Sequence, residues 1–394
     1  MARCLGGGAR AARVLGTETG ALNRGRPVVA CFATQGTDST DERRIRELLA
    51  PLAPEVLRFD RGSKARSVMR LWRELRQLDP DVVVMEGTGI AGGGMLLMAR
   101  ICAQRRYIVS SGDAVGPFLR ARNLPLGLAG AIYERLLYRM SAGFIGWTPY
   151  LVGRALTFGA PRAMTAAGWG APAAGDEARR AIRARYGIPE GALVLGIVGS
   201  LNWTPRYGYC YGQELVRAHN RLSRDDIHVL VVGDGDGRER LQALAGDRLD
   251  VTVHLPGRVS PGEVPEHLAA MDVASLPQSV DGVGSFRYTT KISEYRAAGL
   301  PVVTGQIPLG YDLDDGGLWR LPGDAPWDDV YVAALADLMA QLGDSGTERR
   351  PASDADATGL FSAARQQRQV SAFVCDVVER ERHLAGARSR RGRE

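Results

Sequence analysis

The sequence predicts an α/β protein with two domains, each built on a parallel β-sheet. Short apolar runs alternate with helical patterns, this alternation occurs twice, and a stretch rich in glycine and proline at 153–175 separates the two series. Regular alternation of strands and helices is typical of parallel sheets. The chain of 394 residues is also longer than one hydrophobic core usually accommodates. We therefore expect each series to form its own domain.

The first series follows an arginine- and glycine-rich segment, residues 1–26, which we expect to be a disordered tail. The run RPVVACFATQG has the pattern of a buried strand that enters a polar loop, and STDERRIRELLAPL that of a helix capped by Ser39 or Thr40. Further helix and strand patterns follow at 65–78, 81–85, 93–104, 106–110 and 130–140, and GFIGWTPY resembles a last strand and turn. We assign 27–160 to this domain and 161–185 to a hinge.

The second series repeats the alternation, starting with a helical pattern at 176–186. Its buried strand patterns are ALVLGIVGSL, IHVLVVGDGDG, VTVHLPG, DVASLP and PVVTG, with helical patterns between them at 212–222, 237–245, 262–270 and 290–298. We assign 186–345 to this domain, 346–384 to a C-terminal helical segment and 385–394 to a basic tail. Two such Rossmann-like domains bind ligands beyond the carboxyl ends of their strands. The sequence therefore predicts a ligand cleft between the domains.

The composition excludes several classes of protein. Apolar residues make up 45% of the chain and charged residues 24%, which is typical of soluble globular proteins. No apolar run approaches the roughly 18 residues of a membrane span. Arginines interrupt every apolar run of residues 1–26, so we expect no secretory signal and a cytoplasmic location. The five cysteines are scattered, which disfavours a disulfide framework or a zinc site.

The formal net charge of +6 at first suggests an anionic partner. Residues 1–26 contribute 5 − 1 = +4 and residues 384–394 contribute 4 − 1 = +3, which leaves −1 for residues 27–383. The body of the protein is therefore nearly neutral. We expect no nucleic-acid partner, and contact with an anionic surface through the tails at most.

The segment TTKISEYRAAGLPVV carries the strongest chemical pattern. It predicts a helix that ends at Gly299 and Pro301, with Lys291 and Glu294 three residues apart near one face. A helix start facing a cleft and a lysine can bind phosphate, and a carboxylate one turn later can accept both hydroxyls of a ribose. A surface ion pair worth about 0.2 to 0.5 kcal/mol is an equally good interpretation of the spacing alone. The chain has only two lysines, Lys64 and Lys291, beside 48 arginines, which slightly favours a functional role for Lys291.

Several short motifs of the second half share one order and spacing with a known family. They are Gly196, Val198 and Gly199, the run LVVGDGDGRERLQALA, Gly257, Val259, Asp272 and Pro277, and finally Glu294, Gly299 and Pro301. In these motifs the chain resembles the retaining nucleotide-sugar glycosyltransferases of GT-B architecture, in particular family four. The resemblance implies a GT-B fold and the transfer of a sugar from a nucleoside diphosphate sugar to an acceptor hydroxyl, with retention. It implies no cofactor and no obligatory metal.

The same resemblance implies roles for individual residues. Glu294 would bind the donor ribose, and the backbone near Arg258 and Val259 would contact the base. The glycine turn at Gly199 and the loop from Gly282 to Ser285, which includes Gly284, would approach the diphosphate.

The chain departs from the family pattern at two positions. Phe286 stands where a glutamate is common, and Ser200 stands where an arginine usually follows the first glycine turn. Arg206, near the place of a phosphate-binding lysine, can hold phosphate with two hydrogen bonds. We therefore expect Arg206, Arg287 and Lys291 to contact the diphosphate, and Arg206 and Lys291 to stabilise its negative charge as it leaves.

The first half resembles the family mostly in architecture. Gly36, in Gln35-Gly36-Thr37, resembles the loop that meets the donor phosphates, although an ordinary β–α turn explains it equally well. Glu86, Ser111 and Asp113 follow predicted strands, so we expect them to face the cleft, with Glu86 and Ser111 near the acceptor. Asp113 takes the place of a family histidine that contacts the donor sugar and is a candidate catalytic residue. A helix cap is its alternative role.

Other motifs favour simpler interpretations. Gly233, Gly235 and Gly237 lack the last glycine of a dinucleotide fingerprint and its acidic strand end. Asp234 and Asp236 imitate a metal-binding Asp-x-Asp, but two aspartates in one loop form a weak metal site. We expect turn residues there and no metal. The five histidines follow neither a zinc-binding nor a Ser-His pattern.

The run FLRARNLPLGLAGAIYERLLYRM mixes apolar side chains with Arg120, Arg122, Arg135 and Arg139. We interpret it as an amphipathic core helix with a solvated face, and peripheral contact with an anionic membrane is the alternative.

Two other functions remain open from the sequence. The departures at Ser200 and Phe286 are compatible with a nucleotide-binding GT-B partner protein that lacks transferase activity. An NAD-dependent oxidoreductase would rest on the glycine loop alone. The acceptor, whether a glycan, a lipid-linked molecule or a small molecule, is not identified by any motif.

Overall fold

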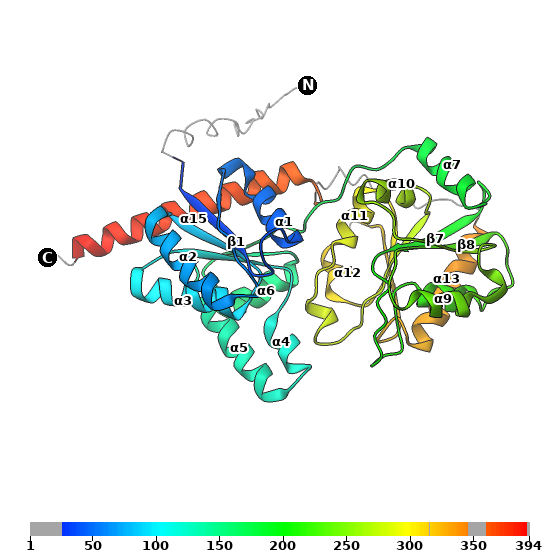
Figure 1. Ribbon diagram of the computed structural model, residues 1–394, viewed down its shortest axis with the longest axis horizontal. Helices are drawn as coiled ribbons and strands as arrows, with labels where there is room; N and C mark the ends of the chain where they lie inside the picture. The colour runs from blue at the N-terminus through cyan, green and yellow to red at the C-terminus, as the bar shows by residue number, and fades with distance from the viewer. Residues whose placement is uncertain (1–25, 315, 346–359, 392–394) are drawn as a thin grey trace, which may run out of the picture.

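The protein folds into two α/β domains that lie side by side, as predicted (Figure 1). The structure is a computed structural model and describes residues 26–314, 316–345 and 360–391. The tail predicted at 1–26 lies almost entirely outside the described residues, as does the end of the tail predicted at 385–394. No described helix is long and apolar enough to cross a membrane.

The N-terminal domain is built on a six-stranded sheet in which all neighbouring strands run parallel. In spatial order the strands are β2 (Glu55–Val56), β1 (Val29–Ala33), β3 (Val82–Glu86), β4 (Tyr107–Ser111), β5 (Gly143–Gly146) and β6 (Ala163–Thr165). Every residue of β1, β3, β4 and β5 is buried, which explains why these strands appear in the sequence as continuous apolar runs.

The C-terminal domain contains a second parallel sheet of six strands. In spatial order they are β12 (Leu318–Leu321), β11 (Val302–Gly305), β10 (Val273–Leu276), β7 (Leu193–Val198), β8 (Ile227–Val232) and β9 (Val253–Gly257). The strand order reverses between β7 and β10. This is the Rossmann order, which creates a crevice at the point of reversal.

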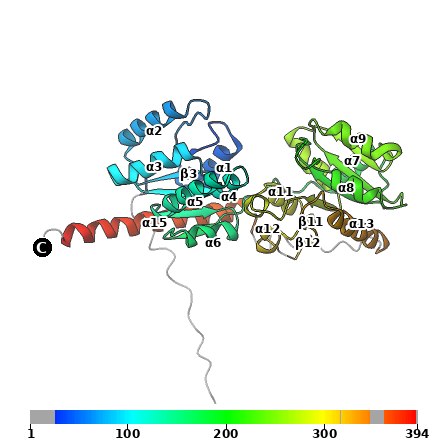
Figure 2. The same cartoon turned by 90° about the horizontal axis from the view of Figure 1, so that it is seen from below.

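Helices cover both sheets (Figure 2). Those of the first domain are α1 (Thr40–Leu48), α2 (Lys64–Leu78), α3 (Ile90–Ala103), α4 (Val115–Arg120), α5 (Leu124–Arg139) and α6 (Pro149–Thr157). Those of the second are α7 (Asp176–Arg185), α8 (Gln213–His219), α9 (Arg238–Ala245), α10 (Val264–Ala269), α11 (Lys291–Ala297), α12 (Pro308–Asp312) and α13 (Asp329–Asp344). The described residues also form four short 3₁₀ turns, η1 (Ala50–Leu52), η2 (Gly246–Arg248), η3 (Pro261–Glu263) and η4 (Gly284–Phe286). Of the two predicted caps of α1, the structure uses Ser39, whose hydroxyl accepts a hydrogen bond from the Glu42 N–H.

The hinge is shorter than the predicted 161–185. Strand β6 belongs to the sheet of the first domain, because it pairs with β5. Helix α7 belongs to the second domain, since Arg183 on it donates a hydrogen bond of 2.7 Å to Asp272 beside β10. The first crossing of the chain between the domains is therefore made by the residues between β6 and α7.

The long helix α15 (Ala363–Arg391) returns the chain from the second domain to the first (Figures 1 and 2). Its buried residues Val370, Val374, Val377 and Val378 pack in the same core as the β1 residue Cys31. The described part of the C-terminal helical segment predicted at 346–384 thus completes the core of the N-terminal domain, and its helix extends to Arg391, into the tail predicted at 385–394.

Candidate active site

The end of β7 lies at the point where the strand order of the C-terminal sheet reverses. The Gly199 N–H donates a hydrogen bond of 2.9 Å to the carbonyl of Val232, the last residue of β8. Gly233 has φ of +148°, and a Cβ there would lie 1.8 Å from the Gly199 oxygen. Glycine at 233 is therefore required for the turns after β7 and β8 to pack together.

Lys291, the first residue of α11, lies directly against the Gly199 turn. A Cβ on Gly199 would lie 2.7 Å from the lysine Cε and 3.1 Å from Nζ, and Nζ lies 4.6 Å from the centre of the Tyr211 ring. Burial lowers the pKa of the Lys291 ammonium group. The negative charge of Glu294 acts to raise this pKa, and the positive charge of Arg287 lowers it further. A desolvated cation beside a glycine turn is well suited to an anionic group.

Glu294 lies one turn after Lys291 on the same helix. Its N–H donates to the Thr290 carbonyl at 3.1 Å, and a Cβ at Gly170 would lie 2.7 Å from the Glu294 Cα. The connection between β6 and α7 therefore passes directly over this part of α11. The two side chains expected to bind phosphate and ribose share one short helix at the mouth of the crevice.

The predicted diphosphate loop is organised by Asp281. Its carboxylate accepts hydrogen bonds from the N–H groups of Val283 at 2.8 Å and Gly284 at 2.7 Å. Burial acts to raise the pKa of Asp281, but these hydrogen bonds hold it below its usual value, and the charge of Arg206 lowers it further. A Cβ on Gly284 would lie 2.0 Å from the Ser279 oxygen, so the turn requires glycine.

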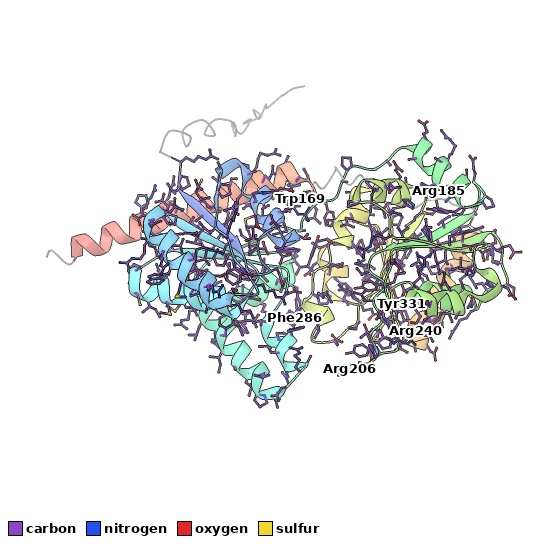
Figure 3. The ribbon with its side chains drawn as sticks, in the orientation of Figure 1. Trp169, Arg185, Arg206, Arg240, Phe286 and Tyr331 are labelled. Atoms are coloured by element: carbon purple, nitrogen blue, oxygen red, sulfur yellow. The ribbon has the colours of Figure 1, made fainter. Side chains whose placement is uncertain are left out.

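Arg206 lies on the exposed loop between β7 and α8, 5.3 Å from the centre of the Tyr207 ring. Figure 3 shows it at the lower edge of the C-terminal domain, below Phe286. Its electrostatic effect on Asp281 indicates that it lies near the diphosphate loop, as expected for a diphosphate contact. A contact between Arg206 and the donor phosphates remains a prediction.

Phe286 faces the N-terminal domain. Its ring stacks on Tyr150 of α6, with 4.8 Å between ring centres and an angle of 19° between planes. The Arg154 guanidinium lies 4.9 Å from the Phe286 ring centre, and Arg154 also bonds to the buried Glu134 at 2.6 Å. The position where the resemblance expects a glutamate is thus occupied by an aromatic contact between the domains, beside the half-buried Ser285.

Tyr288 forms a second contact between the domains. Its N–H donates to the Gly112 carbonyl at 2.8 Å, its hydroxyl donates to the Ala167 carbonyl, and its ring lies 5.0 Å from that of Trp147. The loop between β10 and α11 therefore touches both the candidate donor side and the N-terminal domain.

Asp113 lies at the cleft near Arg287. The residue is exposed, but the surrounding protein removes water from its carboxylate, and this desolvation raises the pKa of Asp113. The positive charge of Arg287 acts to lower the same pKa. Asp113 does not cap α4, because Ala114 is the N-cap residue and the N–H groups of Val115 and Gly116 donate to Glu134. The alternative prediction, in which Asp113 caps a helix, is therefore wrong for α4.

Ser111 takes part in the turn that follows β4. It is buried, its hydroxyl donates to the Asp113 carbonyl at 2.8 Å, and it accepts from the Asp113 N–H at 3.2 Å. The serine therefore shapes the turn after β4, and its predicted contact with an acceptor stays a prediction.

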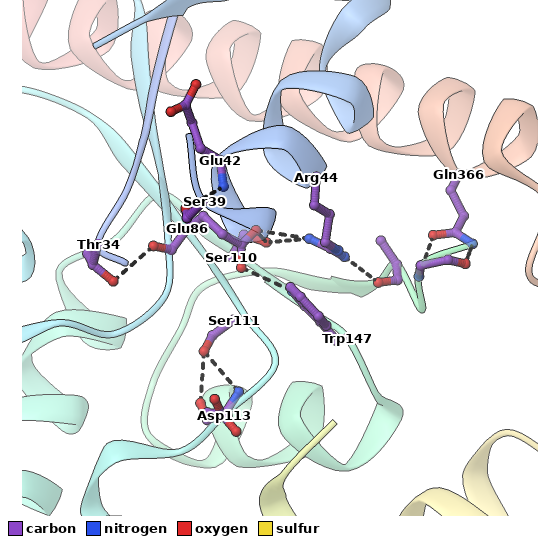
Figure 4. Close-up of polar contacts among 12 residues, drawn as sticks. Thr34, Ser39, Glu42, Arg44, Glu86, Ser110, Ser111, Asp113, Trp147 and Gln366 are labelled. Atoms are coloured by element: carbon purple, nitrogen blue, oxygen red, sulfur yellow. Dashed lines mark hydrogen bonds and ion pairs between the residues drawn. The ribbon is translucent and has the colours of Figure 1, made fainter. Parts of the chain in front are cut away.

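Glu86 differs from its expected role, because it lies in a buried polar network (Figure 4). Only 1% of its surface is exposed. Its carboxylate accepts from Arg44 at 2.9 Å, from the Ser110 hydroxyl at 2.7 Å and from the Trp147 indole at 3.1 Å. With its oxygens occupied in this way, Glu86 fixes the ends of β3, β4 and β5 and is buried, so it does not lie open to the cleft as expected.

Burial raises the pKa of Glu86 to about 7, although the charge of Arg44 acts to lower it. The folded state therefore takes up a proton at higher pH than the unfolded chain, whose value is near 4.5. We expect the wild type to gain stability relative to Glu86→Gln as the pH falls from about 7 to 4.5. Urea denaturation of both proteins across that range measures the difference, and a constant difference would contradict the raised pKa.

Three further candidates lie at the ends of strands. Gly36 is buried with φ of +113°, and its N–H donates to Ala33 in a turn after β1. Arg258 is exposed and Val259 half-buried in the loop after β9. The structure leaves their predicted donor contacts untested.

The structure brings together Gly199, Lys291, Glu294, Arg287 and Asp113 around the crevice. Sequence reasoning did not identify Tyr150, Trp147, Tyr211 or Tyr288 as parts of this region. Trp147 directly follows β5 and Tyr211 directly precedes Gly212, but many core positions share such signals, and Tyr150 and Tyr288 carry neither. The turn role expected for Asp236 agrees with the hydrogen bond that its carboxylate accepts from the Trp203 N–H at 2.6 Å.

The buried histidines His228 and His254 lie with ring nitrogens 2.9 Å apart. Across the described ranges, however, no group of three or more His, Cys, Asp or Glu residues could hold a metal ion.

Comparison with known proteins places the chain among glycosyltransferase folds. Residues 192–341 match the family described as "Glycosyl transferases group 1". A GDP-mannose-dependent alpha-mannosyltransferase of Mycobacterium tuberculosis is 25% identical over 265 residues, which span 67% of this chain and 64% of that relative.

Solved structures resemble nearly the whole fold. HepE of Anabaena in complex with UDP superposes with a TM-score of 0.67 at 16% identity, over 89% of this chain and 100% of HepE. Sucrose-phosphate synthase of Thermosynechococcus elongatus gives a TM-score of 0.67 at 14% identity, over 92% and 100% of the two chains. WaaG, a glycosyltransferase involved in lipopolysaccharide biosynthesis, gives 0.59 at 16% identity, over 87% and 98%. The chain therefore has the GT-B fold with a glycosyl transferases group 1 match in its second domain, and these findings support a GT-B glycosyltransferase.

Proposed function

We propose that the protein transfers a sugar from a nucleoside diphosphate sugar to an acceptor hydroxyl, with retention at the anomeric carbon and without an obligatory metal. The observation that carries this proposal is the position of Lys291 against the Gly199 turn, with Glu294 one turn later on the same helix. The cytoplasmic location and the lack of a nucleic-acid partner remain predictions from the sequence.

The main barrier of such a reaction is the departure of the diphosphate, on which negative charge develops. Lys291, Arg206 and Arg287 are the cations available near the crevice to stabilise it, an electrostatic effect that usually contributes most to catalysis. The acceptor hydroxyl would attack from the face of the leaving group, and the departing phosphate would take its proton. In this scheme Asp113 serves to position the donor sugar and no protein base is required.

The comparisons give support to two different nucleotides of the donor. The mannosyltransferase relative is named for GDP-mannose, whereas HepE was solved with UDP and with UDP-glucose. Thermal-shift measurements with UDP-, GDP- and dTDP-sugars should show one stabilising nucleotide. Product analysis by NMR then tests the anomeric configuration, and the same assay with EDTA tests metal independence. An inverted product or loss of activity with EDTA would contradict the corresponding part of the proposal.

Glu294→Ala should weaken donor binding roughly tenfold or more, because a charged hydrogen-bond acceptor to the ribose is lost. Isothermal titration with the stabilising nucleotide measures the change. Glu266→Ala is the matched control, since it removes an exposed glutamate from α10 of the same domain. Unchanged affinity in Glu294→Ala would remove Glu294 from the donor site.

A nucleotide-binding GT-B partner protein without transferase activity is the second candidate. The observation that favours it is Phe286, which replaces the expected glutamate and packs on Tyr150. Hydrolysis of the donor or transfer by the purified chain would exclude this candidate, whereas nucleotide binding without turnover would favour it.

A further inference from the structure

The first crossing of the chain between the domains is buried where it leaves the N-terminal domain. Its residues Ala166, Ala167 and Gly168, which follow β6 directly, are all buried. Backbone N–H and C=O groups that are buried away from water need hydrogen-bond partners. The partners of these three residues therefore show what holds the crossing in place.

Gln366 on the long helix α15 binds both backbone polar groups of Gly168 (Figure 4). Its side-chain oxygen accepts from the Gly168 N–H at 2.9 Å, and its side-chain nitrogen donates to the Gly168 carbonyl at 2.5 Å. The same nitrogen donates to the Leu360 carbonyl at 2.8 Å, at the described end of the second crossing, which joins α13 to α15. Only 3% of the surface of Gln366 is exposed. A primary amide can accept and donate at once, so this one side chain ties the two crossings together.

The two residues before Gly168 are held by side chains of both domains. The Ala166 carbonyl accepts a hydrogen bond of 2.7 Å from Arg44 on α1. The Ala167 carbonyl accepts from the hydroxyl of Tyr288, which precedes α11. Three successive residues of the crossing are thus bound by α1, by the loop before α11 and by α15. Their position depends on all three parts of the fold.

Beyond Gly168 the crossing lies directly on α11. A Cβ on Gly170 would lie 2.7 Å from the Glu294 Cα and 2.7 Å from the Ser293 carbonyl oxygen. Both are backbone atoms of the helix, so the contact requires glycine. The preceding residue, Trp169, packs on the core that α15 shares with the N-terminal domain, and Figure 3 shows it where the two domains meet. A shift of the crossing would therefore be transmitted to the part of α11 that carries Glu294.

We propose that Gln366 is a positioning residue for donor binding. By holding Gly168, it keeps the crossing in contact with α11 and thereby keeps Glu294 in place relative to the N-terminal half of the cleft. Helix α15 can serve as the fixed support, because Val370 and Val374 are fully buried in the core of the N-terminal domain. Gln366 acts through the backbone of the crossing and does not itself touch the donor. This assignment rests on the proposed donor-binding function of α11.

Loss of these hydrogen bonds should reduce donor affinity more than turnover. Without its partner, the buried Gly168 backbone favours arrangements in which the crossing leaves α11 and reaches water. If about one molecule in ten keeps the competent arrangement, the apparent affinity for the donor falls about tenfold. Bound donor restores that arrangement, so KM should rise while kcat stays nearly unchanged. A variant that is merely less stable would instead lose kcat at constant KM, because part of the enzyme is unfolded.

The test compares Gln366→Met with Gln367→Met in the full chain. Methionine is similar in length to glutamine but cannot form these two hydrogen bonds with Gly168. In Gln366→Met, the KM for the donor and the Kd for its nucleotide, measured by isothermal titration, should both rise about tenfold. Gln367→Met is the matched control, because the amide of this neighbouring glutamine donates to the Glu47 carbonyl of the N-terminal domain at 2.9 Å. Both constants should be unchanged in the control.

Gly170→Ala tests the contact of the crossing with α11 directly. The added methyl group would collide with the helix backbone, so donor affinity should again fall about tenfold. Gly175→Ala is its matched control in the same connection, because a Cβ on Gly175 would meet no atom within 4 Å. Val374→Ala controls for stability, since it removes a fully buried side chain from α15. It should lower the melting temperature and leave KM unchanged.

Small-angle X-ray scattering without nucleotide gives a readout that does not depend on the transferase function. The radius of gyration of Gln366→Met should exceed that of the wild type and of Gln367→Met, because the domains separate. An unchanged KM in Gln366→Met, or a rise in KM that Val374→Ala reproduces, would overturn the assignment. A wild type that binds no nucleotide would contradict the proposed function, and unchanged scattering of Gln366→Met would then show that Gln366 does not hold the crossing either.

Discussion

Replacing Lys291 with methionine should lower turnover by about 10² to 10³-fold, while donor affinity falls much less. The lysine lies against the Gly199 turn and over the Tyr211 ring, where methionine can fill a similar volume without the charge. A preorganised donor group that acts on developing negative charge typically contributes a factor of this size. The effect should appear in kcat and not in KM, because the charge on the diphosphate grows toward the transition state.

The control for this experiment is Lys64→Met. Lys64 is the only other lysine of the chain, and it is exposed at the start of α2 in the N-terminal domain. It should leave kcat and KM unchanged. Steady-state kinetics with the identified donor measure both variants, and a Lys291→Met enzyme with near wild-type kcat would exclude Lys291 from leaving-group stabilisation.

The parts of the fold that could be predicted share a clear local signal. Strands such as β1 and β3 are continuous apolar runs because both faces are buried, and helices such as α1 carry a recognisable N-cap at Ser39. Glycines at 199 and 233 could be recognised as turn residues because each directly follows an apolar strand pattern, whereas the close approaches that require glycine there are visible only in the structure. The apolar runs and the N-cap depend on neighbouring residues alone, so the sequence is sufficient to identify them.

The parts that could not be predicted depend on distant residues. Strand β6 has three half-buried residues and becomes a strand only through pairing with β5, so the predicted hinge began too early. The sequence showed that Glu86 follows a strand but not that Arg44, Ser110 and Trp147 would enclose its carboxylate. Likewise, helical periodicity identified α5 but could not show which of its faces would stay uncovered.

The candidate site also has one part that the sequence could predict and one part that it could not. The motif around Lys291 and Glu294 lies within one helix, so its internal spacing is visible in the sequence. The contact of Phe286 with Tyr150 joins residues of different domains. No local pattern indicates it, because the relation of the two domains is set by packing across the cleft.

Arg44→Met should destabilise the protein by about 3 to 5 kcal/mol, because it removes one partner of a buried ion pair. Arg44 is 8% exposed, and its Nη1 lies 2.9 Å from Glu86 Oε2. Methionine keeps much of the apolar stem of the side chain but leaves the Glu86 carboxylate without a counter-charge. Chemical denaturation of the purified variant measures the loss. Arg43→Met, at the exposed neighbouring position of α1, should change stability by no more than about 0.5 kcal/mol.

A double variant separates the loss of charge from the loss of packing. Glu86→Gln in the Arg44→Met background removes the uncompensated carboxylate and keeps the amide able to bond with Ser110 and Trp147, so it should recover most of the lost stability. If the double variant is as unstable as Arg44→Met alone, the arginine stabilises the domain through its contact with Trp147, whose ring centre lies 3.8 Å from the guanidinium carbon. Because Trp147 packs on Tyr288 of the other domain, that outcome would make the buried network a support of the cleft, and donor binding should then weaken in both variants together.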